Sequence, residues 1–302
     1  MDDMKKIIQR CHDLCHPYRV ASGKDFKLKK FDPADTGPLK SADKPRAKEA
    51  LSKGIEVLAE LQDRLYAQDR WAVLLIFQAM DAAGKDGAIK HVMSGINPQG
   101  CQVYSFKAPS AEDLDHDFLW RTTRCLPERG RIGVFNRSYY EEVLVVRVHP
   151  EILARQKIPA ELVGKKIWDE RYHDIRAFES YIGRQGVVVR KFFLNVSKKE
   201  QLKRFMARLD DPDKNWKFSA TDASERDHWD DYARAYEDLI RETATPSAPW
   251  YVVPADNKWY TRAIVAAAVI DALAELKLEY PKVDKAKSKE LAAARAALTT
   301  RR

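Results

Sequence analysis

Residues 72–87, which read A-V-L-L-I-F-Q-A-M-D-A-A-G-K-D-G, are the stretch that decides the fold. The first six, Ala72–Phe77, form a continuous apolar run, which is typical of a strand buried on both faces of a parallel sheet. Small residues and a lysine follow, and apolar residues recur at helical spacing after Gly87. This order predicts a phosphate-binding turn, because backbone N–H groups and the helix dipole both face the anion.

The turn departs from the usual pattern G-x-x-x-x-G-K-[ST] at two positions. Ala79 stands in place of the first glycine, and Asp86 stands in place of the final hydroxyl residue. Without that hydroxyl, Asp81 and Asp86 are the candidate ligands of Mg²⁺, directly or through water, with Mn²⁺ as the alternative ion. Lys85 is placed to follow the transferred phosphoryl group. An ordinary tight turn between strand and helix is the competing interpretation.

The rest of the chain alternates between short apolar runs and helical patterns. Four further strands are predicted at Gln102–Phe106, Ile132–Phe135, Val187–Leu194 and Trp250–Val253. Helices are predicted near Asp86–Met93, Asp113–Leu126, Ser138–Val148, Ile167–Ile182, Ser197–Leu209, Ala223–Arg241 and Tyr260–Leu278. This alternation predicts an α/β fold with a doubly wound, five-stranded parallel sheet and right-handed crossovers.

We expect residues 1–302 to form a single domain, with extensions at both ends. Residues 1–50 contain several prolines and clustered lysines, and they are expected to form a short helix and an irregular basic arm. The α/β core is expected to span residues 51–280, entered through a helix that begins near Asp43. Residues 283–302, rich in Ala and Lys, are expected to form a frayed helix or a tail.

Composition and charge narrow the classes of function. The net charge of +8 indicates an anionic partner, which could be a nucleic acid, a membrane surface or a phosphate polymer. A solvated basic face without a ligand is the alternative for any single stretch. No apolar run is long enough to span a bilayer, and no secretory signal is recognised. Four irregularly spaced cysteines do not suggest a disulfide framework. We therefore expect a cytoplasmic protein with no membrane partner.

A short cysteine and histidine cluster near the start of the chain has two interpretations. Cys11, His12, Cys15 and His16 could share a tetrahedral zinc ion. No second group of ligands follows, however, and the spacing of four residues also fits one turn of an amphipathic helix. The helical interpretation is favoured.

The second stretch with functional side chains follows the predicted strand Ile132–Phe135. Phosphate-binding enzymes of this type commonly carry there an Asp that holds the Mg²⁺ shell. This chain has Asn136, which adds no charge and makes Asp81 more important. Arg137 is expected at the same carboxyl edge of the sheet, where open α/β folds bind ligands. A salt bridge at the start of the next helix is the alternative role for Arg137.

A third stretch has the features of a lid, near residues 198–225. Ser197 and Glu200 predict a capping box, and the helix that follows has an apolar face made of Leu202, Phe205, Met206 and Leu209. The segment Asp213–Phe218 is basic and aromatic, which suits a lid that closes over phosphates. A solvated helix with a surface turn is the alternative.

Three motifs in this order resemble the polyphosphate kinase 2 family. They are D-A-A-G-K-D-G at Asp81–Gly87, F-N-R-S-Y-Y-E-E at Phe135–Glu142 and R-L-D-D-P-D-K-N-W-K-F at Arg208–Phe218. The resemblance spans about Arg19 to Tyr280. It implies a P-loop kinase of the thymidylate-kinase-like kind with a helical lid, Mg²⁺, polyphosphate as phosphoryl donor and a nucleotide as acceptor.

The resemblance also implies roles for individual residues. The catalytic residues would be Asp81, Lys85 and Arg137, with Asp81 and Asp86 as metal ligands. Polyphosphate would be bound by Ala83, Gly84, Lys85, Asp86, Gly87, Arg121, Arg204 and Arg208, and the nucleotide by Asn136, Arg137 and Glu141. Many relatives carry F-D-R-S-W-Y-N-R at the second motif, so this chain looks like the subgroup that phosphorylates AMP as well as ADP, giving ATP. We also expect a homo-oligomer.

Two other functions compete with this hypothesis. An ATP-dependent kinase for a small molecule would use the same turn without polyphosphate. A nucleic-acid-binding protein would use the basic arm, but the sequence has no helix-turn-helix, zinc-finger or RNA-recognition signature, so nucleic acid is the least favoured partner.

Overall fold

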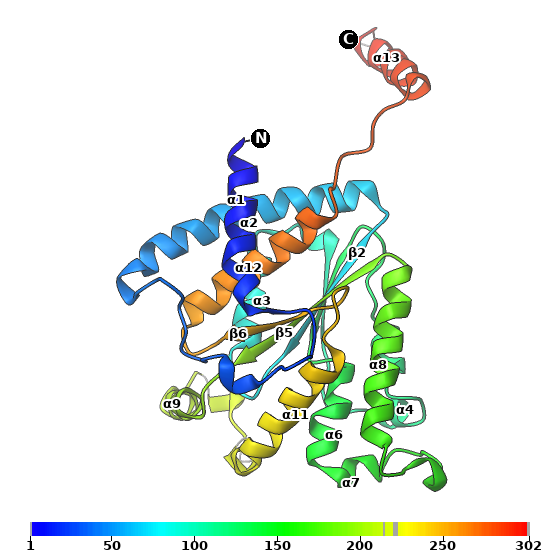
Figure 1. The fold of residues 1–302 in the computed structure, drawn as a ribbon. Helices are drawn as coiled ribbons and strands as arrows, with labels where there is room; N and C mark the ends of the chain where they lie inside the picture. The colour runs from blue at the N-terminus through cyan, green and yellow to red at the C-terminus, as the bar shows by residue number, and fades with distance from the viewer. Residues whose placement is uncertain (1, 214, 220–222, 301–302) are drawn as a thin grey trace.

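The computed structural model describes residues 2–213, 215–219 and 223–300, and its centre is one sheet in the order β1-β6-β5-β2-β4-β3 (Figure 1). The six strands are β1 (Arg19–Val20), β2 (Ala72–Gln78), β3 (Cys101–Ser105), β4 (Ile132–Asn136), β5 (Val187–Asn195) and β6 (Trp250–Pro254). Strands β2 to β6 pair in parallel, which confirms the predicted α/β class. The predicted count of five strands is wrong by one. The missed strand β1 pairs antiparallel with β6 over only two residues, too few for a periodic pattern.

Helices cover both faces of the sheet (Figure 1). One face carries α1 (Asp2–Cys15), α2 (Lys44–Gln68), α3 (Lys85–Val92) and α12 (Lys258–Glu275), and the other carries α6 (Val145–Val148), α8 (Ile167–Arg184) and α11 (Trp229–Thr243). Strand β2 serves both cores, because alternate residues of a strand point to opposite faces. Val73 and Leu75 pack on the first face. Leu74 and Ile76 pack on the second, which explains the continuous apolar run.

The remaining elements connect these layers or extend from them. The other helices are α4 (Ala111–Leu114), α5 (Trp120–Thr123), α7 (Pro150–Leu153), α9 (Lys198–Leu209) and α13 (Lys285–Thr300). Single 3₁₀ turns lie at His16–Tyr18, Leu28–Lys30, Ser41–Asp43, Met93–Gly95, Pro98–Gly100, Tyr139–Val143, Ala160–Leu162, Asn215–Lys217 and Glu225–His228. Helix α13 stands apart from the sheet (Figure 1). Across the described ranges, every helix is too short or too polar to cross a membrane.

Two predicted helices are wrong in extent. The segment predicted as Asp113–Leu126 is broken between α4 and α5, where the Asp117 carboxylate accepts a hydrogen bond from the Leu119 N–H at 2.9 Å. Such a local side-chain bond competes with the helical ladder. The segment predicted as Ser138–Val148 is a 3₁₀ turn followed by α6, separated by the non-helical backbone of Leu144.

The cysteine and histidine cluster is part of a helix, as the favoured interpretation held. Within residues 2–213, 215–219 and 223–300, no three His, Cys, Asp or Glu side chains are grouped to hold a metal ion. Helix α1 packs on α12 instead. His12 Nδ1 lies 3.0 Å from Asp271 Oδ1, and the Cys15 side chain is fully buried beside them.

Candidate active site

The phosphate-binding turn connects β2 to α3 at the carboxyl edge of the sheet. Two of its residues have left-handed backbone conformations, Ala82 with φ +58° and Gly84 with φ +106°. Gly84 adopts this conformation without penalty, whereas Ala82 is strained by about 1 to 2 kcal/mol. Strain of this kind persists where the surrounding structure fixes the backbone, and it is common at functional sites. The turn is therefore held in a defined shape.

Lys85 lies across this turn. Its Nζ donates a hydrogen bond to the carbonyl oxygen of Ala79 at 2.9 Å. Burial, followed by the nearby Arg137 guanidinium, lowers the pKa of Lys85 despite the opposing carboxylates around the site. A phosphate group is the kind of ligand that would further stabilise the positive charge of Lys85.

Arg137 joins the second motif to the turn. Its backbone has φ +64°, and its N–H donates to the Phe77 carbonyl at 3.0 Å, which fixes it against β2. Its guanidinium lies 3.2 Å from Asp81 Oδ1 and 3.2 Å from Glu141 Oε2. The Glu141 carboxylate is the strongest influence that raises the pKa of Arg137. Arg137 lies before the 3₁₀ turn Tyr139–Val143, and its side chain pairs with that of Glu141 within this turn.

Asn136 and Asp86 form a second contact between the same two segments. The Asn136 amide donates to Asp86 Oδ1 at 2.8 Å. Asp81 and Asp86 therefore both face the carboxyl edge of the sheet, and no third acidic, His or Cys side chain of the described residues joins them in a metal cage. Such a pair fits Mg²⁺, which is commonly held by one or two carboxylates together with water and substrate phosphates.

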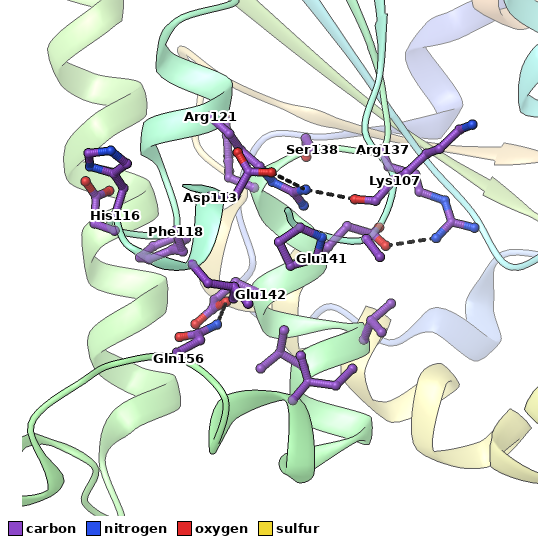
Figure 2. A pocket seen from close by; sticks show the side chains of 18 residues that line it. Lys107, Asp113, His116, Phe118, Arg121, Arg137, Ser138, Glu141, Glu142 and Gln156 are labelled. Atoms are coloured by element: carbon purple, nitrogen blue, oxygen red, sulfur yellow. Dashed lines mark hydrogen bonds and ion pairs between the residues drawn. The ribbon is translucent and has the colours of Figure 1, made fainter. Parts of the chain in front are cut away.

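Two cavities share Arg137 and Glu141 as lining residues. The first has a volume of about 180 Å³ and is lined also by Lys107, Phe118 and Arg121. Figure 2 shows Arg137 and Glu141 pointing toward each other at this cavity. Arg121 donates to the Lys107 carbonyl at 2.8 Å, and no residue of the phosphate-binding turn lines this cavity. The structure therefore brings Arg121 together with Arg137 and Glu141, two of the three predicted nucleotide-binding residues, and not with the turn; Asn136 does not line this cavity.

The second cavity lies between the turn and α11. It has a volume of about 260 Å³, and its walls include Asp81, Trp229, Tyr232 and Tyr236. The three aromatic residues were not singled out from the sequence, and neither were Lys107 and Phe118 of the first cavity. No motif marks them: the three aromatic residues lie on α11, whereas Lys107 follows β3 and Phe118 lies in the turn between α4 and α5.

Helix α9 differs from its sequence-based description. Of its predicted apolar face only Phe205 is buried, whereas Leu202, Met206 and Leu209 are exposed. The capping box is only half formed, because the Ser197 hydroxyl accepts the Glu200 N–H while the Ser197 N–H donates to Asp256. The predicted lid, near residues 198–225, extends into residues 214 and 220–222, which lie outside the described residues.

The two predicted lid arginines occupy different environments. Arg204 is buried beneath the phosphate-binding turn, where backbone carbonyls surround its guanidinium. Arg208 lies one turn further along α9, with its guanidinium 5.7 Å from the centre of the Phe205 ring. The structure thus brings Arg204, but not Arg208, into hydrogen-bond contact with the turn, and it does so through main-chain oxygens.

Comparison with known proteins gives consistent similarities over most of the chain. The family described as Polyphosphate kinase 2 matches residues 41–281. An ADP-polyphosphate phosphotransferase from Rhodopseudomonas palustris is 56% identical over 275 residues, which cover 91% of this chain and 94% of that protein. An AMP/ADP-polyphosphate phosphotransferase from Meiothermus ruber is 43% identical over 272 residues, covering 90% and 97%. A crystal structure of polyphosphate kinase 2 from Arthrobacter aurescens has a TM-score of 0.83 at 42% identity, covering 93% and 96%.

Proposed function

The chain belongs to the polyphosphate kinase 2 family, and from this premise we propose that it transfers phosphoryl groups between inorganic polyphosphate and AMP or ADP. The observation that carries the proposal is the partly buried ammonium of Lys85, which lies on the turn between β2 and α3 and donates there to the Ala79 carbonyl. The two similar phosphotransferases from Rhodopseudomonas palustris and Meiothermus ruber, both named for polyphosphate, support it as the second substrate.

The reaction needs positioning and charge neutralisation more than covalent chemistry. The end of the polyphosphate chain would lie on the turn, against Lys85. An oxygen of the nucleotide's last phosphate attacks the terminal phosphorus in line and forms the new P–O bond. The bond to the next phosphate unit breaks, and its electron pair stays on the oxygen of the shortened polymer. Arg137, held between Asp81 and Glu141, is placed to neutralise charge on the transferred group.

We propose that Asp81 and Asp86 hold Mg²⁺, or Mn²⁺ in its place. The ion, when bound, would neutralise charge on the phosphates. The protein's own part is to keep the two carboxylates at the turn. Asp81 is oriented by Arg137, and Asp86 is oriented by the Asn136 amide.

We propose that the acceptor nucleotide enters the cavity of Figure 2. Phe118 offers an apolar surface for a base, and Arg121 and Arg137 offer positive charge for its phosphates. Glu141 would then face a neutral donor such as an adenine amino group, since a carboxylate would repel phosphate. Both AMP and ADP are proposed as acceptors, with ATP as the product that completes the series.

We further propose that the protein works in the cytoplasm as a homo-oligomer. The four unpaired cysteines fit a reducing compartment. Light scattering coupled to size-exclusion chromatography measures the oligomeric state, and a monomeric mass would contradict that part of the proposal.

The test of the function uses ADP or AMP with Mg²⁺ and polyphosphate as the sole phosphoryl donor. We expect ATP to form, and we expect none when the polymer has been digested to orthophosphate beforehand. Absence of product with intact polyphosphate, together with phosphorylation of a small molecule by ATP, would favour the ATP-dependent kinase instead.

A further inference from the structure

The underside of the phosphate-binding turn is held by side chains of α9. Three consecutive carbonyl oxygens of the turn accept hydrogen bonds from this helix. Gln201 Nε2 donates to the Asp81 oxygen at 3.0 Å, and Arg204 Nη1 donates to the oxygens of Ala82 at 3.0 Å and Ala83 at 2.7 Å. The turn is therefore attached to α9 along its main chain.

These bonds determine where the amide groups of the turn point. In a trans peptide the carbonyl of one residue and the N–H of the next point in opposite directions. When α9 holds the carbonyls of Asp81, Ala82 and Ala83, the N–H groups of the following residues point away from α9. The Ala83 N–H donates to the Met80 carbonyl within the turn at 3.3 Å, so the N–H groups of Ala82 and Gly84 are the donors that a phosphate would use. The strained conformation of Ala82 is maintained by the same contacts.

Arg204 has no donor left for a phosphate in this arrangement. A guanidinium has five N–H groups. Two of them bind the turn, Nη2 donates to the carbonyls of Ala255 at 2.6 Å and Asp256 at 3.1 Å, and Nε donates to Glu200 at 2.9 Å. The side chain is also only 7% exposed. Arg204 therefore connects the turn to the end of β6, where it is shielded from the site.

The segment Ala255–Asp256, which directly follows β6 and binds Arg204, also fixes the start of α9. The Asp256 carboxylate accepts from the Ser197 N–H at 2.8 Å and from the Ser197 hydroxyl at 2.7 Å. Gln201 is oriented in turn by Arg226, which donates to Gln201 Oε1 at 2.7 Å. The turn, the segment after β6 and the first turns of α9 thus form one hydrogen-bonded unit, in which α9 supports the turn.

We propose that Arg204 and Gln201 are positioning residues that orient the amide groups of the turn toward the phosphoryl donor, and that Arg204 does not bind polyphosphate. The inference rests on the proposed function for the identity of the donor. The geometry of the support is independent of it and can be measured without any substrate.

The first measurement is amide hydrogen exchange over the turn and the start of α3, in phosphate-free buffer. Arg204→Lys keeps the positive charge, but a lysine cannot bridge four carbonyls as a guanidinium does. We expect faster exchange of the Ala83 and Ala88 amides, which are bonded within this segment. The matched control is Lys203→Ala on the exposed side of α9, which we expect to leave the exchange unchanged.

The second measurement is steady-state kinetics with polyphosphate and ADP. We expect Arg204→Lys to lower kcat/KM for polyphosphate by about 10- to 100-fold, the scale of a misplaced catalytic group. KM for ADP should stay within about twofold, because the nucleotide cavity keeps its contacts. A fall in kcat/KM without faster exchange would mean that Arg204 contacts the phosphates directly, and this would overturn the proposal. Faster exchange with unchanged kinetics would also overturn it.

Gln201→Glu provides a second variant should Arg204→Lys fail to fold. The new carboxylate can still accept from Arg226, but it cannot donate to the Asp81 carbonyl. We expect the same faster exchange and a smaller kinetic loss, of about threefold to tenfold. A wild-type enzyme inactive with polyphosphate would refute the proposed function, whereas unchanged exchange in both variants would refute the support by α9.

Discussion

Two lysines of this protein, Lys85 at the carboxyl edge of the sheet and Lys191 within β5, have different partners. Burial lowers the pKa of both Lys85 and Lys191. Lys191, on β5, is completely buried, and its Nζ lies 2.7 Å from Glu179 Oε2 and 2.7 Å from the Thr243 carbonyl. Lys85 donates to one carbonyl, that of Ala79, among the described residues.

The difference in partners indicates that the charge of Lys191 stabilises the fold, whereas the charge of Lys85 serves the active site. A buried charge is costly unless it is paired and hydrogen-bonded. Lys191 has an ion-pair partner inside the fold, and Glu179 also accepts from the Tyr139 and Tyr140 hydroxyls at 2.9 and 2.8 Å. Those tyrosines lie two and three residues after Arg137, so the buried Lys191–Glu179 pair supports the segment that carries Arg137. Within residues 2–213, 215–219 and 223–300, Lys85 has no ion-pair partner at salt-bridge distance, and a bound phosphate would stabilise its charge.

The largest effect is expected for Lys191→Met. Removal of the ammonium leaves Glu179 buried without a counter-charge, so the free energy of unfolding should fall by about 3 to 5 kcal/mol. Urea unfolding measures the change. The double variant Lys191→Met/Glu179→Gln should recover part of the loss, because it removes the uncompensated carboxylate. An equal loss in both variants would contradict the role of the ion pair.

Lys85→Met should act in the opposite way. Loss of a preorganised cation at the reacting group should lower kcat by about two to three orders of magnitude. The free energy of unfolding should be unchanged or higher, because the variant no longer buries a positive charge. A stability loss of more than about 1 kcal/mol would show that Lys85 resembles Lys191 after all.

The stability difference between Lys85→Met and wild type should also depend on pH in a defined direction. The pKa of Lys85 is lower in the folded protein than in the unfolded chain, so the unfolded chain binds the lysine proton more tightly. The free energy of unfolding of the wild type therefore rises with pH between the lowered pKa and the ordinary lysine pKa. The advantage of the variant is thus largest below the lowered pKa, and it shrinks as the pH approaches 10.5, the ordinary lysine value. Urea unfolding at a series of pH values measures it, and an advantage that grows with pH would contradict this account.

The two carboxylates beside Lys85, Asp81 and Asp86, should contribute unequally to kcat/KM. Asp81→Asn removes the ion pair with Arg137 as well as a proposed metal ligand, whereas Asp86→Asn alters a contact with the neutral Asn136. We expect kcat/KM to fall about tenfold further for Asp81→Asn than for Asp86→Asn. Titration of Mg²⁺ against both variants shows how much of each loss extra metal restores. Equal losses or a reversed order would contradict the greater importance of Asp81.

The smallest effect is expected for Glu141→Asn. If Glu141 selects the acceptor, kcat/KM for AMP should fall about threefold to tenfold more than for ADP. If it only orients Arg137 through their 3.2 Å contact, both values should fall in parallel. The ratio of the two constants in one folded variant decides, and parallel behaviour would remove Glu141 from nucleotide selection.

The surroundings of Lys85 were easier to predict from the sequence than the surroundings of Lys191. A strand, a turn of small residues and a helix are local patterns, and the structure has them as expected. The Lys191–Glu179 pair joins β5 to α8, and no spacing rule connects the two residues. A lysine inside the apolar run of β5 was visible, but its partner depends on how α8 packs against the sheet.

Tertiary contacts also give different environments to residues that the sequence pattern does not distinguish. Arg204 and Arg208 lie four residues apart on one predicted helix, so periodicity gives both the same face. In the folded structure, carbonyl oxygens of the phosphate-binding turn and of the segment after β6 surround Arg204, and only the tertiary fold brings these two segments to its side of α9. Similarly, the helix predicted at Ser138–Val148 is interrupted by the non-helical backbone of Leu144, which apolar spacing does not reveal.

The most direct test of the account is the rise in Tm produced by polyphosphate in wild type, Lys85→Met and Lys191→Met. A ligand that binds the folded state stabilises it by about 2.7 kcal/mol at one hundred times its Kd. Sulfate at matched ionic strength controls for general anion effects. We predict a clear rise for wild type and for Lys191→Met, although the latter starts from a lower Tm, and little or no rise for Lys85→Met. An equal rise in all three proteins would contradict the claim that the charge of Lys85 is stabilised by the phosphoryl donor.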